Sequence, residues 1–258
     1  MQQKLRGVIS IAGHDPCGGA GVLADIKTFE AHRVVGLGVT TAITYQNDVE
    51  FTGLHWLLDS QVENQISILE KRFYFDVAKI GLVKDLDSVS EIVKQLKKAN
   101  PNIKIIWDPI LKASAGYEFH SNWNLESILS LLTEIDLIVP NALEINTLLP
   151  QLAPTEAACL LSRHCDVLLK GGHLDGQNVS DTLFEKGVMS HSINNERIPR
   201  NEKRGTGCVL SSAIASNLHL GFNVIEACEK AVKYVRQYIV SSDTRLGFHK
   251  ADHSMIPV

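Results

Sequence analysis

Short runs of β-branched and apolar residues alternate along this chain with longer segments whose apolar residues recur at helical spacing. The short runs predict strands at 7–12, 38–45, 77–80, 103–107, 136–139 and 166–169. The longer segments predict helices at 20–32, 60–73, 88–99, 125–132, 142–149, 155–164, 206–220 and 224–241. This alternation favours an α/β fold with three layers, in which helices cover both faces of a mostly parallel sheet.

The alternation changes near 181–193, where two short strand patterns follow each other without a helix between them. They predict an antiparallel hairpin at one edge of the sheet. The chain has no internal repeat, low-complexity tract or linker composition, so we expect one domain over 1–258, although the length would allow two.

Charge and composition argue against several classes of protein. The formal net charge of -4 lacks the basic footprint of a nucleic-acid-binding protein. The longest uncharged stretch, 205–225, contains too many polar residues for a membrane span, and the apolar run at 8–12 is too short for a secretory signal. Five cysteines without a CxxC pair indicate free thiols in a reducing compartment, so we expect a cytoplasmic protein.

In a parallel sheet, ligands bind beyond the carboxyl ends of the strands, so the residues that follow each strand are the candidates for a site. Nearly all of them are glycine or polar. They are 13–21, 46–48, 81–83, 108–109, 141–144 and 170–172.

The first candidate motif is the glycine-dense loop 13–21, GHDPCGGAG, which precedes a helix that carries Asp25. Such a loop lets the backbone approach a ligand closely, but it is also typical of an ordinary strand-to-helix turn. Residues 19–24 match the dinucleotide pattern GxGxxA formally, yet the predicted strand ends too early for that motif.

The second candidate motif is Gly205-Thr206-Gly207-Cys208 at the start of a predicted helix. Unpaired N–H groups and the helix dipole favour an anion there, and they should lower the pKa of a cysteine in the first turn. The alternative is a structural cysteine behind a helix cap. The preceding Lys203 and Arg204 favour phosphate binding.

Further candidates follow three other strands. Asn141 and Glu144 have the spacing of a helix capping box, and the carboxylate could also hold Mg²⁺ near nucleotide phosphates. Asp108 supplies a second carboxylate, although an Asp-Pro pair is usually a turn. Lys170, followed by Gly171, Gly172 and His173, could reach a phosphate, or the glycines could simply turn into the hairpin.

Several other activities lack their sequence motifs. The chain has no HExxH zinc motif, no GxSxG nucleophile elbow and no GxxxxGK[ST] phosphate loop. Anion-binding loops and carboxylates along one rim instead indicate phosphoryl transfer from a nucleotide.

These motifs appear together in a characteristic order. They are VISIAGHDPCGGAGVLADIKT at 8–28, Gln46-Asn47, Lys79-Ile80-Gly81, Trp107-Asp108-Pro109, Pro140-Asn141 with Glu144, Lys170-Gly171-Gly172-His173 and Gly205-Thr206-Gly207-Cys208. Over essentially the whole chain they resemble the hydroxymethylpyrimidine/phosphomethylpyrimidine kinases of thiamine biosynthesis, which belong to the ribokinase-like superfamily.

The resemblance implies a ribokinase-like fold and two successive phosphorylations by ATP with Mg²⁺. The hydroxymethyl group of 4-amino-5-hydroxymethyl-2-methylpyrimidine would be phosphorylated first and the resulting monophosphate second. The partners would be small molecules, with no nucleic acid or membrane, and the enzyme would be a homodimer.

The resemblance also implies a role for each candidate residue. Asp25, Gln46 and Gly13 would bind the aminopyrimidine, and Gly205, Thr206, Gly207 and Cys208 would form the catalytic anion hole. Lys170, Asn141 and Arg204 would contact ATP, and Asp108 and Glu144 would support Mg²⁺. Cys208 stands where sugar kinases of the superfamily carry an aspartate base. Our hypothesis is that it acts as a thiolate base, and the alternative is that it only packs the hole.

The chain departs from the family pattern at three places. His14 and Cys17 replace small hydroxyl residues, Leu82-Val83 stands where a methionine is common, and Arg204 replaces a histidine or small residue. The first two changes could reshape the pyrimidine pocket, whereas Arg204 adds charge beside the phosphates.

Three other functions remain open on the sequence. Pyridoxal/pyridoxine kinase is the nearest, but Gln46 with Asp25 favours a ring that carries an exocyclic amine. A non-catalytic pyrimidine-binding protein would not need Asp108, Lys170 and Cys208. A dehydrogenase rests only on the displaced glycine match.

Overall fold

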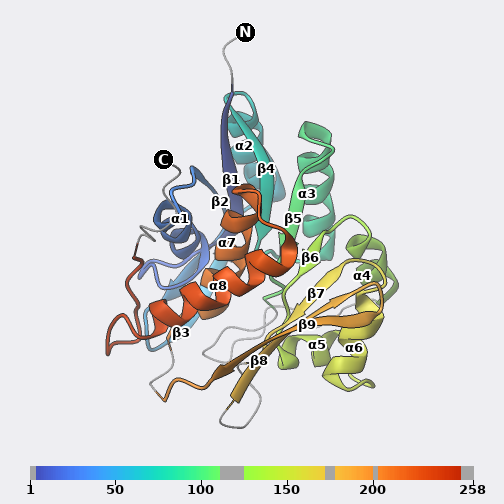
Figure 1. The fold of residues 1–258 in the computed structure, drawn as a ribbon. Helices are drawn as coiled ribbons and strands as arrows, with labels where there is room; N and C mark the ends of the chain where they lie inside the picture. The colour runs from blue at the N-terminus through green and yellow to red at the C-terminus, as the bar shows by residue number, and fades with distance from the viewer. Residues whose placement is uncertain (1–3, 111–124, 172–177, 200–202, 251–258) are drawn as a thin grey trace.

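The computed structural model describes residues 4–110, 125–171, 178–199 and 203–250 (Figure 1). A nine-stranded sheet runs through it in the order β3-β2-β1-β4-β5-β6-β7-β8-β9. The strands are β1 (Leu5–His14), β2 (Gly36–Gln46), β3 (Phe51–Trp56), β4 (Phe73–Ile80), β5 (Lys104–Trp107), β6 (Leu137–Ile138), β7 (Asp166–Leu169), β8 (Asn178–Glu185) and β9 (Val188–Glu196).

The inner strands pair in parallel, and the sheet is antiparallel only at its two edges. The hairpin of β8 and β9 forms one edge, as the sequence predicts, and β3 pairs antiparallel with β2 at the other. The expected mostly parallel α/β fold is confirmed.

Helices lie on both faces of the sheet (Figure 1). They are α1 (Gly21–Ala31), α2 (Asp59–Glu70), α3 (Leu86–Ala99), α4 (Leu125–Leu132), α5 (Ala142–Leu148), α6 (Pro154–Leu161), α7 (Thr206–His219) and α8 (Val224–Ile239). Helices α1, α7 and α8 share one apolar core with the sheet, and α2 to α6 share the core on the other face.

Alternation within the strands assigns each side chain to one of these cores. In β1, Val8 packs toward α1, α7 and α8, whereas Ile9 and Ile11 face the opposite core. Val77 and Ala78 divide β4 in the same way. Because both faces are covered, the parallel strands read in the sequence as nearly continuous apolar runs.

Two details differ from the sequence prediction. Strand β3 was not predicted, because it lies at an edge with no fully buried residue and includes Gly53, so it lacks the alternation of a half-buried strand. The helix predicted at 60–73 ends at Glu70, and Phe73 begins β4 opposite Leu5. Phe73 still packs against the core, which is why it fits an apolar helical stripe.

The order of the strands fixes the position of the site. From β1 the chain crosses to β2 on one side, and it later returns to form β4 on the other side of β1. The loops that follow β1 and β4 therefore diverge at this point, where parallel α/β sheets bind ligands. Within the described residues, we find no helix with the length and apolar character needed to span a bilayer.

Candidate active site

The glycine loop after β1 is organised around the carboxylate of Asp15, whose exposed fraction is 1%. That carboxylate accepts hydrogen bonds from the backbone N–H groups of Cys17 (3.1 Å) and Ala20 (2.9 Å). Gly21 has a φ of +59°, and a Cβ there would lie 2.1 Å from the carbonyl oxygen of Gly13. The loop thus turns back on the end of β1 so closely that a side chain at Gly21 has no room.

The two glycine motifs, far apart in sequence, are in direct contact. Gly205 precedes α7 with a φ of +69°, and a Cβ at this position would lie 1.9 Å from the carbonyl oxygen of Gly19. The absence of a side chain therefore allows the N-terminus of α7 to pack on the first glycine loop. The N–H groups in the first turn of an α-helix have no partner within the helix, and such termini favour anions, so Thr206 and Gly207 are candidates to bind one beside that loop.

Asp25 lies beneath this contact in a buried polar cluster. Its carboxylate accepts hydrogen bonds from Lys79 Nζ (2.8 Å), Ser10 Oγ (2.5 Å) and Ser212 Oγ (2.7 Å). Ser10 and Lys79 are register partners on β1 and β4, Asp25 lies on α1, and Ser212 lies on α7. The exposed fraction of each of these side chains is 0%.

The cluster thus links the neighbouring strands β1 and β4 to α1 and α7, the two helices that follow the glycine motifs. Burial lowers the pKa of Lys79, but the negative charges of Asp25 and Asp108 outweigh it and hold that pKa above its ordinary value. Asp25 is thus held within the protein by an ammonium group and two hydroxyls.

The expected lowering of the Cys208 pKa is wrong. Burial raises the pKa of the thiol to about 11, and Asp25 and Asp108 act in the same direction. The ammonium of Lys79 and a hydrogen bond with the backbone of Gly21 oppose this rise without cancelling it. Desolvation of the thiolate therefore outweighs the groups that favour it, and the pKa of Cys208 lies well above neutral pH.

A second charged group lies beside the N-terminus of α7. Lys170, at the end of β7, contacts Asp108 Oδ1 at 2.9 Å and Glu144 Oε2 at 3.4 Å. Ser211 Oγ of α7 donates to the other oxygen of Asp108. A Cβ on Gly207 would lie 3.5 Å from Lys170 Nζ, so the lysine adjoins the anion-binding turn.

The charged side chains of Asp108, Glu144 and Lys170 shift one another's pKa. Burial would raise the pKa of Asp108, but Lys170 and then Lys79 lower it below its ordinary value. Burial raises the pKa of Glu144, and the carboxylate of Asp108 adds to the rise. The pKa of Lys170 lies above its usual range, because these two carboxylates outweigh its burial.

Asn141 and Glu144 form the predicted capping box at the start of α5. The Asn141 side chain accepts from the N–H of Glu144 (2.9 Å), and Glu144 Oε2 accepts from the N–H of Asn141 (2.7 Å). Asn141 also forms a bridge with Lys170 of the neighbouring strand end. The cap thus holds Glu144 beside Lys170.

The donor chemistry of Asp108 and Glu144 fits a magnesium ion that arrives with a nucleotide. Mg²⁺ binds carboxylate oxygens, usually one or two, and completes its shell with water and phosphate oxygens. Lys170 contacts both carboxylates, and no cluster of three or more metal-ligating side chains occurs among the described residues. The arrangement fits a shared metal–phosphate shell rather than a metal cage built by protein alone.

Gln46 and Arg204 meet at the other side of the glycine loop. Gln46 Nε2 donates to Thr44 Oγ1 at 2.8 Å, and the Gln46 carbonyl oxygen accepts a hydrogen bond from the guanidinium of Arg204. The Arg204 side chain passes over Gly19, where a Cβ would lie 3.5 Å from that of Arg204. Arg204 therefore adjoins Gln46, the predicted pyrimidine ligand, whereas the prediction assigns it to ATP.

The expected contribution of Lys203 to phosphate binding is wrong. Lys203 is buried, and its ammonium donates to the carbonyl oxygen (2.6 Å) and hydroxyl (2.7 Å) of Ser242 and to the carbonyl oxygen of Thr244. These hydrogen bonds hold the segment after α8 to the residues just before α7. Gly172 and His173 of the predicted phosphate motif lie outside the described residues.

Sequence reasoning missed the contributions of four residues. Lys79 entered only as part of a family motif, although a lysine in an apolar strand is a signal for a buried ion pair. Ser10 and Ser212 carry no comparable signal, because serines occur in many strands and helices. Tyr238, whose hydroxyl donates to the carbonyl oxygen of Arg204, reads as part of the apolar face of α8.

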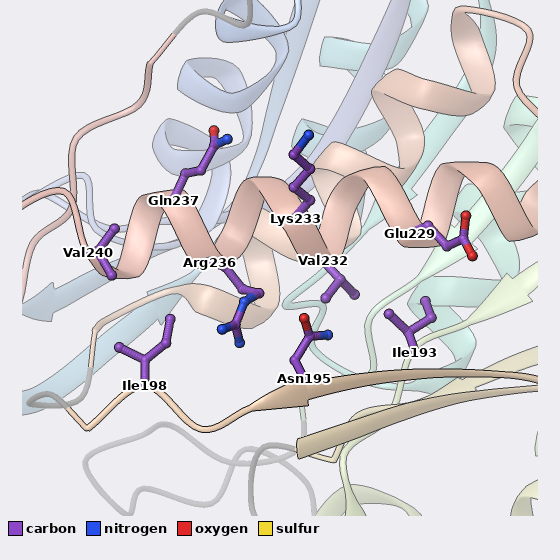
Figure 2. A pocket seen from close by; sticks show the side chains of 9 residues that line it. All are labelled: Ile193, Asn195, Ile198, Glu229, Val232, Lys233, Arg236, Gln237 and Val240. Atoms are coloured by element: carbon purple, nitrogen blue, oxygen red, sulfur yellow. The ribbon is translucent and has the colours of Figure 1, made fainter. Parts of the chain in front are cut away.

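A separate groove lies between β9 and α8, with a volume of about 480 Å³ (Figure 2). Its lining includes the apolar side chains of Ile193, Ile198 and Val232, with Lys233 and Arg236 on α8. None of its described lining residues is a predicted site residue. The functional candidates gather at the glycine loops instead.

Comparison with known proteins places this site in a family context. The family model for phosphomethylpyrimidine kinase matches residues 15–253. A thiamine biosynthesis multifunctional protein of Corynebacterium efficiens is 32% identical over 92% of this chain, which spans only 33% of that longer protein. A hydroxymethylpyrimidine/phosphomethylpyrimidine kinase of Aquifex aeolicus is 31% identical over 91% of this chain and 94% of its own length.

Solved structures share the fold. A phosphomethylpyrimidine kinase of Clostridium difficile superposes with a TM-score of 0.74 and 30% identity, covering 91% of this chain and 99% of its own. A pyridoxal kinase of Staphylococcus aureus in complex with AMP-PCP gives a TM-score of 0.83 at 23% identity, covering 98% of this chain and 96% of its own. The arrangement of the sheet and helices is thus the ribokinase-like one.

Proposed function

The chain belongs to the phosphomethylpyrimidine kinase family, and we propose that it transfers phosphoryl groups from ATP to 4-amino-5-hydroxymethyl-2-methylpyrimidine and then to its monophosphate. One observation supports this most: the N-terminus of α7 packs on the first glycine loop at Gly19 and Gly205, beside the ammonium of Lys170. Backbone N–H groups and a cation so arranged suit the charge that develops on a transferring phosphoryl group.

We place the acceptor between the end of β2 and the first glycine loop. Gln46 would bind the ring through its carboxamide, and Gly13 would contribute its backbone beside Leu82, whose Cδ2 lies 2.9 Å from where a Cβ of Gly13 would stand. The carboxylate oxygens of Asp25 already accept hydrogen bonds from three protein groups. Asp25 would therefore support the acceptor site indirectly, through the cluster with Lys79. Direct contact with the ring would require one of those hydrogen bonds to be exchanged.

We place the nucleotide phosphates against Lys170 and Asn141 and the first turn of α7. Asp108 and Glu144 would hold Mg²⁺ or its bound water, and the ion would offset the negative charge of the phosphates. The complex of the related pyridoxal kinase with AMP-PCP, an analogue of ATP, supports the use of ATP here. The charges of Lys170 and the helix terminus then orient the terminal phosphoryl group toward the acceptor.

The two transfers differ in their protons. In the first, the hydroxymethyl oxygen bonds to the terminal phosphorus of ATP, the bond to the leaving ADP oxygen breaks, and the hydroxyl proton must be released. In the second, an oxygen of the monophosphate is the nucleophile, and at neutral pH it carries little or no proton to lose because its second pKa is about 6. Because burial raises the pKa of the Cys208 thiol to about 11, we propose that this proton does not pass to Cys208 but moves late, as in a loose transition state, to an oxygen of the transferred phosphoryl group and then to water.

A coupled assay of ADP release with MgATP tests this function. Hydroxymethylpyrimidine, its monophosphate and pyridoxal are compared as acceptors at matched concentrations. We expect turnover on both pyrimidines well above that on pyridoxal. Turnover on pyridoxal alone would show that Gln46 does not select an aminopyrimidine. Absence of turnover on all three acceptors would favour the alternative of a non-catalytic pyrimidine-binding protein.

A further inference from the structure

Arg204, one of the departures from the family pattern, contacts Gln46 and adjoins the first glycine loop. Its backbone is fixed on two sides, because its N–H donates to the carbonyl oxygen of Arg245 (2.9 Å) and its carbonyl oxygen accepts from Tyr238. The residue that follows it, Gly205, precedes the anion-binding turn of α7. Its side chain reaches back over the glycine loop to Gln46.

The guanidinium of Arg204 retains unused binding capacity. One terminal nitrogen donates to the neutral carboxamide of Gln46, while the Nε–H is buried and has no hydrogen-bond partner among the described residues. Leaving a buried donor without an acceptor is unfavourable. A ligand oxygen that reached this nitrogen would satisfy it.

The charge of Arg204 is also less compensated than that of the two lysines in the site. Lys79 is paired with Asp25, and Lys170 is paired with Asp108 and Glu144. Arg204 has no ion pair with any carboxylate in the described part of the chain. The nearby carboxylate of Asp15 is directed into the backbone N–H groups of its own loop.

We propose that Arg204 binds the phosphate of the monophosphate acceptor and so favours the second phosphoryl transfer over the first. The proposal rests on the proposed function, since it assigns the ring to Gln46 and the transferred phosphoryl group to the first turn of α7. The acceptor's own phosphate must lie between these two, and Arg204 spans that interval. The monophosphate carries a charge of about −1.5 to −2 at neutral pH, whereas the alcohol carries none.

The test is steady-state kinetics of the full chain with MgATP and each pyrimidine in turn, for wild type and Arg204→Gln. A hydrogen-bonded charge pair predicts a rise of about tenfold to hundredfold in KM for the monophosphate. KM for the alcohol should change less than about threefold, because no charge pair is lost with it. Arg204→Lys, which keeps the charge, should recover part of the affinity for the monophosphate.

Arg245→Gln is the matched control. It removes the same charge from an exposed neighbour whose backbone contacts that of Arg204, and both KM values should stay near those of wild type. A denaturation curve for Arg204→Gln verifies folding, and calorimetry of monophosphate binding without ATP gives a readout that is independent of turnover. Weaker binding of the monophosphate, with unchanged binding of the alcohol, supports the proposal.

Three results would overturn the assignment. Equal rises in KM for both acceptors would show that Arg204 acts only by orienting Gln46, and unchanged values for both would show that it contacts neither. A change confined to KM for ATP would show that Arg204 contacts the nucleotide, as the sequence analysis predicts. If the wild-type chain turns over neither pyrimidine, the proposed function itself fails, and this result is distinct from a loss confined to the variant.

Discussion

Replacing Lys79 by methionine would remove the ammonium from the buried cluster and leave the carboxylate of Asp25 without a counter-ion. The exposed fraction of both side chains is 0%, so water cannot take over the role of the lysine. Two hydrogen bonds, from Ser10 and Ser212, would remain on the carboxylate. The methionine fills a similar volume, so the change isolates the charge.

The expected loss follows from what remains around Asp25. Breaking a buried ion pair by removing one partner costs about 3–5 kcal/mol. The two serine hydroxyls offset part of this, which places the expectation near 3 kcal/mol. Since 1 kcal/mol corresponds to about 2–4 °C for a chain of this size, Tm should fall by about 6–12 °C.

The double variant Lys79→Met/Asp25→Asn gives the decisive comparison. It removes both charges and keeps an acceptor for the serines, so at least about half of the loss should be recovered, since replacing a whole buried pair is often close to neutral. Urea denaturation at pH 7.5 measures all the free energies of unfolding. Lys94→Met, which breaks the exposed pair with Glu91, is the control and should change stability by less than about 0.5 kcal/mol.

The variant Asp25→Asn is measured alone as well. The reasoning fails if the losses of stability in Lys79→Met and in Asp25→Asn simply add in the double variant. Additive losses would mean that Lys79 and Asp25 contribute through packing and not through their mutual charge. A loss of stability below about 1 kcal/mol in Lys79→Met would also contradict the reasoning, because leaving a buried carboxylate without its counter-ion costs far more than that.

Three further predictions concern the site and the sheet. Because the pKa of the Cys208 thiol is about 11, Cys208→Ala should lower kcat for the alcohol and for the monophosphate by the same factor, and a selective loss of about 10² or more on the alcohol would restore the base hypothesis. Lys170→Met should lower kcat/KM for ATP by about 10² or more while KM for the pyrimidine changes little, and an equal change in both would contradict its place on the phosphates. Burial raises the pKa of Asp166 to about 6, above its unfolded value, so the native state loses stability as pH rises through 6. Asp166→Asn should therefore stabilise the chain by about 1 kcal/mol at pH 7.5 and not at pH 4, as measured by urea denaturation, given that this side chain is only half-buried.

The fold could be predicted from the sequence because the periodicity reports burial, which is a local property. The inner strands β1, β4, β5, β6 and β7 are covered on both faces, so their apolar runs are nearly continuous. Strand β3 is held by hydrogen bonds to β2, and Phe51 and Trp56 at its two ends are only partly buried. A strand of that kind leaves little trace in the pattern of apolar residues.

The site could be predicted as a set of residues but not as a set of pairs. Glycine motifs and strand-end carboxylates mark the rim, and the structure does bring Gly205 to Gly19 and Lys170 to Asp108. Which cation meets which partner depends on register and on the crossing of helices. Lys203 and Arg204 are adjacent in the chain, yet one is directed to the backbone after α8 and the other to Gln46.

The pKa of Cys208 could not be predicted for a related reason. A helix N-terminus lowers the pKa of a thiol that remains hydrated, whereas complete burial raises it. The sequence places Cys208 in the first turn of α7 but carries no information on its solvation. Thr206 and Gly207 are partly exposed, whereas Cys208 and the serines of the following turn, Ser211 and Ser212, are buried.

The segment that follows α8 has a consequence for synthesis of the protein on the ribosome. Lys203 and Arg204, just before α7, are bound by backbone groups of Thr244 and Arg245, and Leu246 lies against Gly19. The first glycine loop, at 13–21, emerges from the exit tunnel long before the groups at 244–246 that hold it against α7. A nascent chain can build the whole sheet, from β1 to β9, before then, while the contact between the two glycine motifs becomes fixed only after 244–246 have emerged.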